Sequence, residues 1–145
     1  MKNYRVILLT VDLDPASQDL LLLQAKEILE ATGAKLYMAH AVEQISSYGA
    51  AYGVAAGAEI EEALVESAQS SMTELAKRLN LPAEQVIIKV GPPKAIILEE
   101  AERLNVDLII VGSHGRHGIR LLLGSTANAV LHSANCDVLA VRIKD

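Results

Sequence analysis

The chain has 145 residues, 51% of them apolar, so it can bury the core of one ordinary domain. Its net charge of −5 and its lack of Trp and Phe argue against a nucleic-acid binder, which needs a basic surface and stacking rings. A single cysteine, Cys136, excludes an intrachain disulfide, and no apolar run has the length of a signal peptide or membrane span. We therefore expect one domain over residues 1–145, located in the cytoplasm, with neither nucleic acid nor membrane as a partner.

Strands and helices are predicted to alternate along the whole chain. Apolar runs without a helical period predict strands, and apolar positions three or four apart predict helices. Asp14 and Pro15 suit the N-cap and first position of a helix, and Gly33 suits its end. In chain order the elements are strand 6–11, helix 14–33, strand 35–42, helix 59–79, strand 85–90, helix 91–104, strand 107–111, helix 125–133 and strand 137–143. This order predicts a parallel sheet with helices on both faces.

Two of these segments, the loop at residues 48–57 and the helix at residues 59–79, allow more detailed predictions. Residues 48–57 are small and show no period, so we expect a loop that is either a surface connection or a lid over a ligand. In helix 59–79 the apolar positions fall on one face, which is expected to be buried. These positions are Ile60, Leu64, Ala68, Met72, Leu75 and Leu79.

A glycine-rich stretch near the C-terminus is the strongest functional signal. The apolar run from Leu108 to Val111 is expected to break at Gly112; further glycines stand at 115, 118 and 124, and a helix is expected from Ser125. A strand, a glycine-rich loop and a helix start together favour phosphate binding, because backbone amides and the helix dipole converge there. The sequence therefore predicts an anion site, most simply for a nucleotide, and a glycine-rich turn without a ligand is the alternative.

Other polar residues in these segments have two interpretations each. Asp12 ends the first strand and would either accept a hydrogen bond from a ribose hydroxyl or cap the following turn. Ser125 and Thr126 would donate to phosphate, cap their helix, or do both. His114, His117 and His132 do not have the spacing of a zinc site, so no metal-ligating residue is assigned. We expect these histidines to line the loop, to hydrogen-bond phosphate or to be solvated. No nucleophile, paired carboxylates or catalytic triad is evident, so no catalytic residue is assigned.

Taken in order, these residues resemble the universal stress protein family over the whole chain. The resemblance rests on the run from Val6 to Asp12, the strand end at His40, the run from Asp107 to Gly115, the Gly124-Ser-Thr triplet and the run after Cys136. It implies a Rossmann-like open sheet of five strands in the order 3-2-1-4-5. It also implies an ATP-binding subgroup with the pattern Gly-x-x-Gly, nine residues, then Gly-Ser/Thr; here the gap is residues 116–123, one residue shorter.

The resemblance also implies a binding site and a partner. Adenine would meet the backbone of Ala41 and ribose would meet Asp12, while the glycine stretch would hold ribose and phosphates. The implied nucleotide-binding residues are Thr10, Asp12, Ala41, Gly112, Gly115, Arg116, Gly124, Ser125 and Thr126. The nucleotide would be ATP, or ADP or AMP, with Mg or Mn on its phosphates. A homodimer through Val138–Ile143 is implied as well; without it, the chain's own helix and tail would have to cover that edge.

Three functions agree with these observations. The first is a nucleotide-binding regulator of the stress response, which fits a complete motif without catalytic groups. The second is a slow ATPase, in which His114 orients water near the phosphates. The third is a protein-interaction module of the same fold, in which the glycine stretch holds no nucleotide.

Overall fold

The structure is a computed structural model, and it describes residues 2–45, 54–114 and 124–143. Five parallel strands form one sheet in the order β3-β2-β1-β4-β5, as the sequence predicted. The strands are β1 (Val6–Thr10), β2 (Lys35–Val42), β3 (Val86–Val90), β4 (Leu108–His114) and β5 (Asp137–Ile143). The helices are α1 (Pro15–Thr32), α3 (Val54–Arg78), α4 (Pro93–Arg103) and α5 (Ser125–Ser133), with a short 3-10 helix, η1 (Ala83–Gln85).

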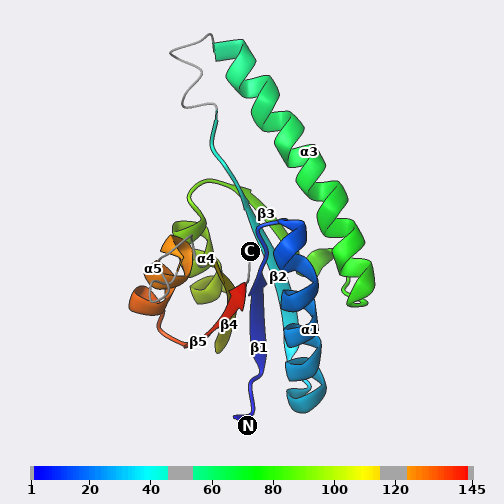
Figure 1. Cartoon of the computed structure of the whole chain (residues 1–145), viewed down its shortest axis with the longest axis vertical. Coiled ribbons are helices and arrows are strands. Elements are labelled where there is room, and N and C mark those ends of the chain that lie inside the picture. The colour runs from blue at the N-terminus through cyan, green and yellow to red at the C-terminus, as the bar shows by residue number, and fades with distance from the viewer. Residues whose placement is uncertain (1, 46–53, 115–123, 144–145) are drawn as a thin grey trace.

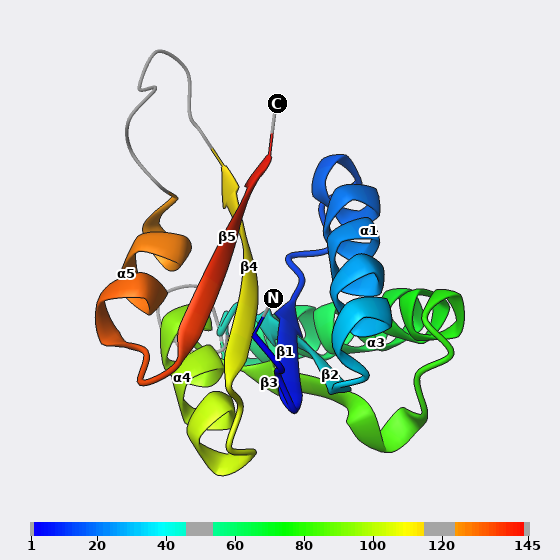
Figure 2. The same cartoon turned by 90° about the horizontal axis from the view of Figure 1, so that it is seen from below.

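The helices form two layers that sandwich the sheet (Figure 2). Alternate side chains of the central strands point to opposite layers, because successive residues of a strand face opposite sides. Ile7 and Leu9 of β1 pack with α1 and α3, whereas Leu8 packs with α4 and α5. All three side chains are fully buried. The continuous apolar run in the sequence therefore corresponds to a strand covered on both faces.

The first helix begins and ends where the sequence predicted. The Asp14 carboxylate accepts a hydrogen bond from the Ala16 amide at 3.0 Å, and Pro15 occupies the first helical position. Gly33 ends the helix with φ of 67°, a left-handed conformation that costs a residue with a Cβ more than it costs glycine. The Asp14 cap fixes where the chain enters α1 after β1, and Gly33 fixes where it leaves α1 toward β2; Leu21 of α1 lines the site described below.

Two predicted boundaries are wrong. The strand that was expected to break at Gly112 continues to His114, because Gly112, Ser113 and His114 pair with the last three residues of β5. The predicted loop 48–57 overlaps a helix, since α3 already begins at Val54. Residues 48–53 lie outside the described residues, so the choice between a connection and a lid stays open.

The buried face predicted for α3 holds only in its second half. Ala68, Met72 and Leu75 are buried against the sheet, but Ile60 is 50% and Leu64 is 38% exposed. Figure 1 shows the reason, since the first half of α3 extends beyond the sheet it packs on. A helical period identifies an apolar face, but it does not say how much of that face another element covers.

One buried acid joins α4 to the neighbouring strand. The Glu100 side chain is 2% exposed, and its Oε2 accepts a hydrogen bond from Arg103 Nε at 2.6 Å. Its Oε1 lies 3.0 Å from Lys89 Nζ, an ion pair whose geometry does not satisfy a hydrogen bond. Because Arg103 donates to the charged form and Lys89 adds to the effect, the pKa of Glu100 is held below its ordinary value.

Candidate functional site

A cavity of about 610 Å³ lies at the carboxyl ends of β1, β2 and β4. This is where β1 has neighbours on both sides, β2 and β4, and where open α/β sheets bind ligands. The helix that follows β1, α1, packs on one face of the sheet, and the helix that follows β4, α5, packs on the other, so a crevice can open between the two strand ends. The volume falls within the range of pockets that hold cofactor-sized molecules.

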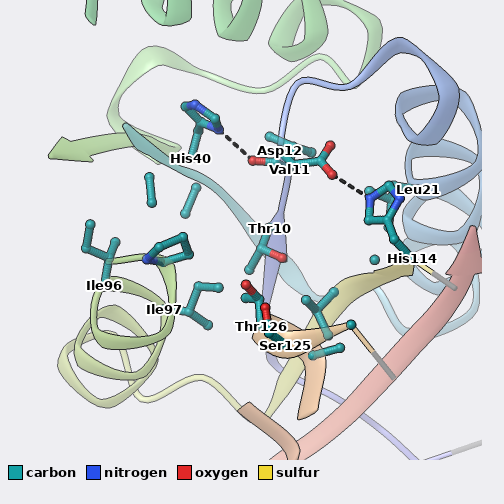
Figure 3. Close-up of a pocket in the computed structure, with 17 residues that line it drawn as sticks. Thr10, Val11, Asp12, Leu21, His40, Ile96, Ile97, His114, Ser125 and Thr126 are labelled. Carbon is teal, nitrogen blue, oxygen red and sulfur yellow. Dashed lines mark hydrogen bonds and ion pairs between the residues drawn. The ribbon is translucent and has the colours of Figure 1, made fainter. Parts of the chain in front are cut away.

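One side of the cavity is apolar. Ile96 and Ile97 of α4 lie together on this side (Figure 3). The wall also includes Val11, Ala39, Ala41 and Pro93. Ala41 comes from β2, so the position predicted to offer its backbone to adenine does line the cavity. Such a wall suits a flat, weakly polar group such as a nucleobase.

A second part of the lining is the start of α5. Gly124 is the N-cap residue, so the interpretation of Ser125 or Thr126 as an N-cap is wrong, and among the described residues no side chain caps this helix. The Gly124 amide donates to Ser113 Oγ at 3.3 Å, whereas the next amides begin a helix and have no acceptor within it. Ser125 and Thr126 both line the cavity. This end of α5 therefore presents donors and the positive end of a helix dipole to the cavity.

Gly124 is required at its position by a close approach. A Cβ built on it would lie 3.3 Å from the His114 backbone nitrogen and 3.6 Å from the His114 carbonyl oxygen. The start of α5 therefore rests directly on the end of β4. Gly112 is different, because its Cβ would meet Ile143 at 3.4 Å and Leu21 at 3.6 Å, which are contacts to flexible side chains.

Asp12 stands at the mouth of the cavity with both oxygens engaged. Oδ1 accepts hydrogen bonds from the Asp14 amide at 2.9 Å and from Ser17 Oγ at 2.8 Å, so the predicted turn cap is confirmed. Oδ2 lies 2.7 Å from His114 Nε2, a contact visible in Figure 3. Partial burial raises the pKa of Asp12, but the hydrogen bonds outweigh it and the pKa is lowered overall. Asp12 is therefore a carboxylate at neutral pH.

The remaining polar residues of the cavity are held by the backbone. Thr10 is buried, and its hydroxyl donates to the Ile110 carbonyl at 3.1 Å, which ties β1 to β4. His40 Nδ1 lies 2.7 Å from the Val11 carbonyl oxygen. Because a carbonyl only accepts, this nitrogen carries the proton. These two bonds link the ends of β1, β2 and β4 where they line the cavity.

Comparison with known proteins agrees with this fold and cavity. The model of the universal stress protein family matches residues 3–142. The chain belongs to the universal stress protein family. It is 60% identical over 144 residues to universal stress protein A homolog 2 of Coxiella burnetii, covering 99% of both chains.

Solved structures of universal stress proteins share the fold. The UspA structure from Lactobacillus plantarum superposes with a TM-score of 0.81 and 26% identity, over 98% of this chain and all of that one. A universal stress protein in complex with cAMP superposes with a TM-score of 0.61 and 26% identity, over 97% of this chain and 98% of that one. At least one universal stress protein of this fold therefore binds a nucleotide.

Of the nine predicted nucleotide-binding residues of this universal stress protein, seven line the one cavity. These are Thr10, Asp12, Ala41, Gly112, Gly124, Ser125 and Thr126. The other two, Gly115 and Arg116, lie outside the described residues. The sequence did not predict that Asp12 and His114 would meet, nor that Asp14 would lie beside them. The two apolar runs that end near Asp12 and His114 could have suggested that these residues meet, since the carboxyl ends of parallel strands lie at the same edge of a sheet.

Proposed function

We propose that this universal stress protein is a nucleotide-binding regulator that takes an adenine nucleotide, ATP or its di- or monophosphate, into the cavity. One observation carries the proposal: the same cavity is lined by apolar side chains of α4 and by the start of α5, whose N-cap residue provides no side-chain cap. A nucleotide has the matching asymmetry, with an apolar base at one end and phosphates at the other. The complex of a related structure with cAMP supports the same ligand class.

In this proposal the ligand lies across the ends of the strands. The base packs on Ile96 and Ile97 and meets the Ala41 backbone, and the phosphates meet the first amides of α5. Asp12 is the nearest carboxylate for a ribose hydroxyl, but both its oxygens already hold protein donors. The ribose would therefore share Oδ2 with His114 or displace it. Any Mg²⁺ or Mn²⁺ carried on the phosphates arrives with the ligand.

The first prediction tests the helix start with Ser125→Glu. Glutamate in the first turn favours the helix, because its charge opposes the positive end of the dipole, yet it repels phosphate from the same amides. We expect ATP affinity, measured by calorimetry, to fall at least tenfold while the melting temperature stays level or rises. Ser70→Glu is the matched control, because Ser70 is exposed on α3 outside the cavity. Equal affinity in wild type and Ser125→Glu, or no binding of ATP, ADP or AMP to wild type, would contradict the proposal.

The slow-ATPase alternative depends on His114. Its Nε2 is paired with Asp12, an arrangement that orients an imidazole as in catalytic dyads. Turnover of bound ATP that disappears in His114→Ala, with binding retained, would favour the ATPase over the regulator. The interaction module, the cytoplasmic location and the homodimer stay predictions, and the homodimer is tested below. In the described parts of the chain, no helix is both long and apolar enough to cross a bilayer.

A further inference from the structure

Three potential metal ligands gather at the mouth of the cavity. Asp12 and Asp14 come from the turn between β1 and α1, and His114 comes from the end of β4. Each offers one ligand atom, and these atoms lie within 4.8 Å of one another. Asp12 and His114 are 102 residues apart in sequence, so no short sequence motif contains the cluster.

Hydrogen bonds inside the turn fix both carboxylates. Asp12 Oδ1 is held by the Asp14 amide and Ser17 Oγ, and Asp14 Oδ1 is held by the Ala16 amide. Leu13 between them adopts a left-handed φ of 64°, which is uncommon for a bulky residue and turns the chain sharply. With one oxygen of each carboxylate anchored, the geometry of the pair is set before any ligand arrives. Outer hydrogen bonds of this kind orient the ligands of metal sites.

The contact across the cavity mouth has the spacing of two neighbouring metal ligands. Asp12 Oδ2 and His114 Nε2 are 2.7 Å apart. Adjacent ligands of an octahedral ion with bonds of about 2.1 Å stand roughly 3 Å apart, so a shift of a few tenths of an ångström opens the pair to an ion. The proton between them is exchanged for the metal when the imidazole binds in its neutral form.

The donor set decides which cations fit. One imidazole and two carboxylates suit first-row divalent ions such as Mn²⁺, Fe²⁺, Co²⁺ and Zn²⁺. Mg²⁺ prefers oxygen ligands alone and keeps most of its water, and a site for a soft ion would need thiolates. The only cysteine, Cys136, is not in the cluster.

We propose that Asp12, Asp14 and His114 form a protein-built site for a first-row divalent transition cation at the mouth of the cavity. The site exists without nucleotide, so it differs from an ion that arrives on phosphates. Three protein ligands leave positions for water or for ligand oxygens from the cavity.

The test uses the whole chain without nucleotide. It is titrated with Mn²⁺, and electron paramagnetic resonance measures the concentration of free Mn²⁺. A second titration with Zn²⁺ is measured by calorimetry. We expect one ion per chain. Asp14→Asn and His114→Ala are each expected to weaken binding at least tenfold. Asparagine is as good an N-cap as aspartate, so Asp14→Asn removes the charge while keeping the start of α1. Mg²⁺ at the same concentration is expected to bind much more weakly.

Matched controls are His132→Ala and Asp19→Asn, an exposed histidine at the end of α5 and an exposed aspartate of α1 that lies outside the cluster. Both are expected to bind the ions like wild type. Binding that is equal in all variants, or that appears only after ATP is added, would overturn the proposal. ATP titration in the presence of EDTA separates the two ideas, because loss of the metal site with ATP binding intact leaves the nucleotide proposal standing.

Discussion

Asp12 shows how much of a functional side chain can be read from its neighbours in sequence. Its bond from the Asp14 amide joins residues two apart, a habit of aspartate in turns, and was predicted. Its bond to His114 joins the ends of two strands, and depends on which strands become neighbours. Residue type and local spacing predicted that Asp12 belongs to the site, but only the fold shows that its second oxygen is already occupied.

Glu100 allows a prediction at the same scale. Glu100→Gln removes a charge that is buried beside Arg103 and Lys89, and we expect the free energy of unfolding to fall by about 1–2 kcal/mol at pH 7. Urea unfolding followed by circular dichroism measures it. Glu74→Gln is the matched control, since Glu74 makes the same i,i+3 contact to Lys77 with both side chains exposed. It should change the free energy by less than about 0.5 kcal/mol.

The pH dependence of the Glu100 effect has a definite sign. Because the pKa of Glu100 is lowered in the folded state, the ionised carboxylate stabilises the protein above its unfolded pKa of about 4.3. This stabilisation is lost as the pH falls through the folded pKa. The difference between wild type and Glu100→Gln should therefore shrink as the pH drops from 7 to 3. A difference that stays constant over this range would mean that packing, not charge, is responsible.

Among the elements, α5 begins without a cap from its N-cap side chain, as α4 does, but the start of α5 lines the cavity. A helix start that is exposed to water satisfies its amides with solvent, and one that faces a cavity can satisfy them with an anion. The sequence predicted the start at Ser125 correctly, because the Gly-Ser-Thr triplet precedes an apolar helical pattern. It could not predict that Gly124 rests on the backbone of His114, since that contact depends on how far β4 continues.

Gly124→Ala should therefore affect the binding of ATP more than it affects folding. Its added Cβ must push α5 away from β4, and we expect at least fivefold weaker ATP binding with a loss of about 1 kcal/mol in stability. Gly33→Ala should cost a similar amount of stability because its φ is positive, yet nothing lies within 4 Å of the added Cβ. Calorimetry and thermal melting of both variants separate the two effects. An equal loss of ATP affinity in both would refute the specific role of Gly124.

Element boundaries were predicted less well than element types, and two of them show why. β4 passes beyond Gly112 because pairing with β5 outweighs the preference of glycine for turns. α3 begins early because Val54 and the small residues after it lack the apolar period that marks a helix but still tolerate one. In both segments tertiary contacts or chain context, rather than local preference, decide the end of the element.

At the scale of the whole molecule, the two edges of the sheet differ in how exposed the side chains of their strands are. The β3 edge carries Lys89, and a lysine on an edge strand discourages pairing with another chain. Four consecutive residues of β5, from Asp137 to Ala140, are half-buried, and only Arg142 among its last residues is exposed. The family resemblance implied a dimer through β5, and this contrast between the edges is consistent with that expectation.

Ala140→Lys is predicted to convert the dimer to a monomer. A lysine in the middle of β5 would bring like charges together across a two-fold interface. Light scattering coupled to gel filtration measures the mass of the particle. Val90→Lys places the same side chain on the opposite edge, where Val90 is 40% exposed, and should leave the mass unchanged. Monomeric wild type, or loss of the dimer only in Val90→Lys, would rule out association through β5.

The register of the last two strands has a thermodynamic consequence. His114 and Ile143 are paired across β4 and β5, so the edge expected to join two copies and the mouth of the cavity are adjacent strands of one sheet. Linkage requires reciprocity between them: a ligand that tightens self-association by some factor is itself bound more tightly by the same factor in the associated form. In such a protein, the fraction of chains with bound ligand would depend on the concentration of the protein as well as on the concentration of the ligand.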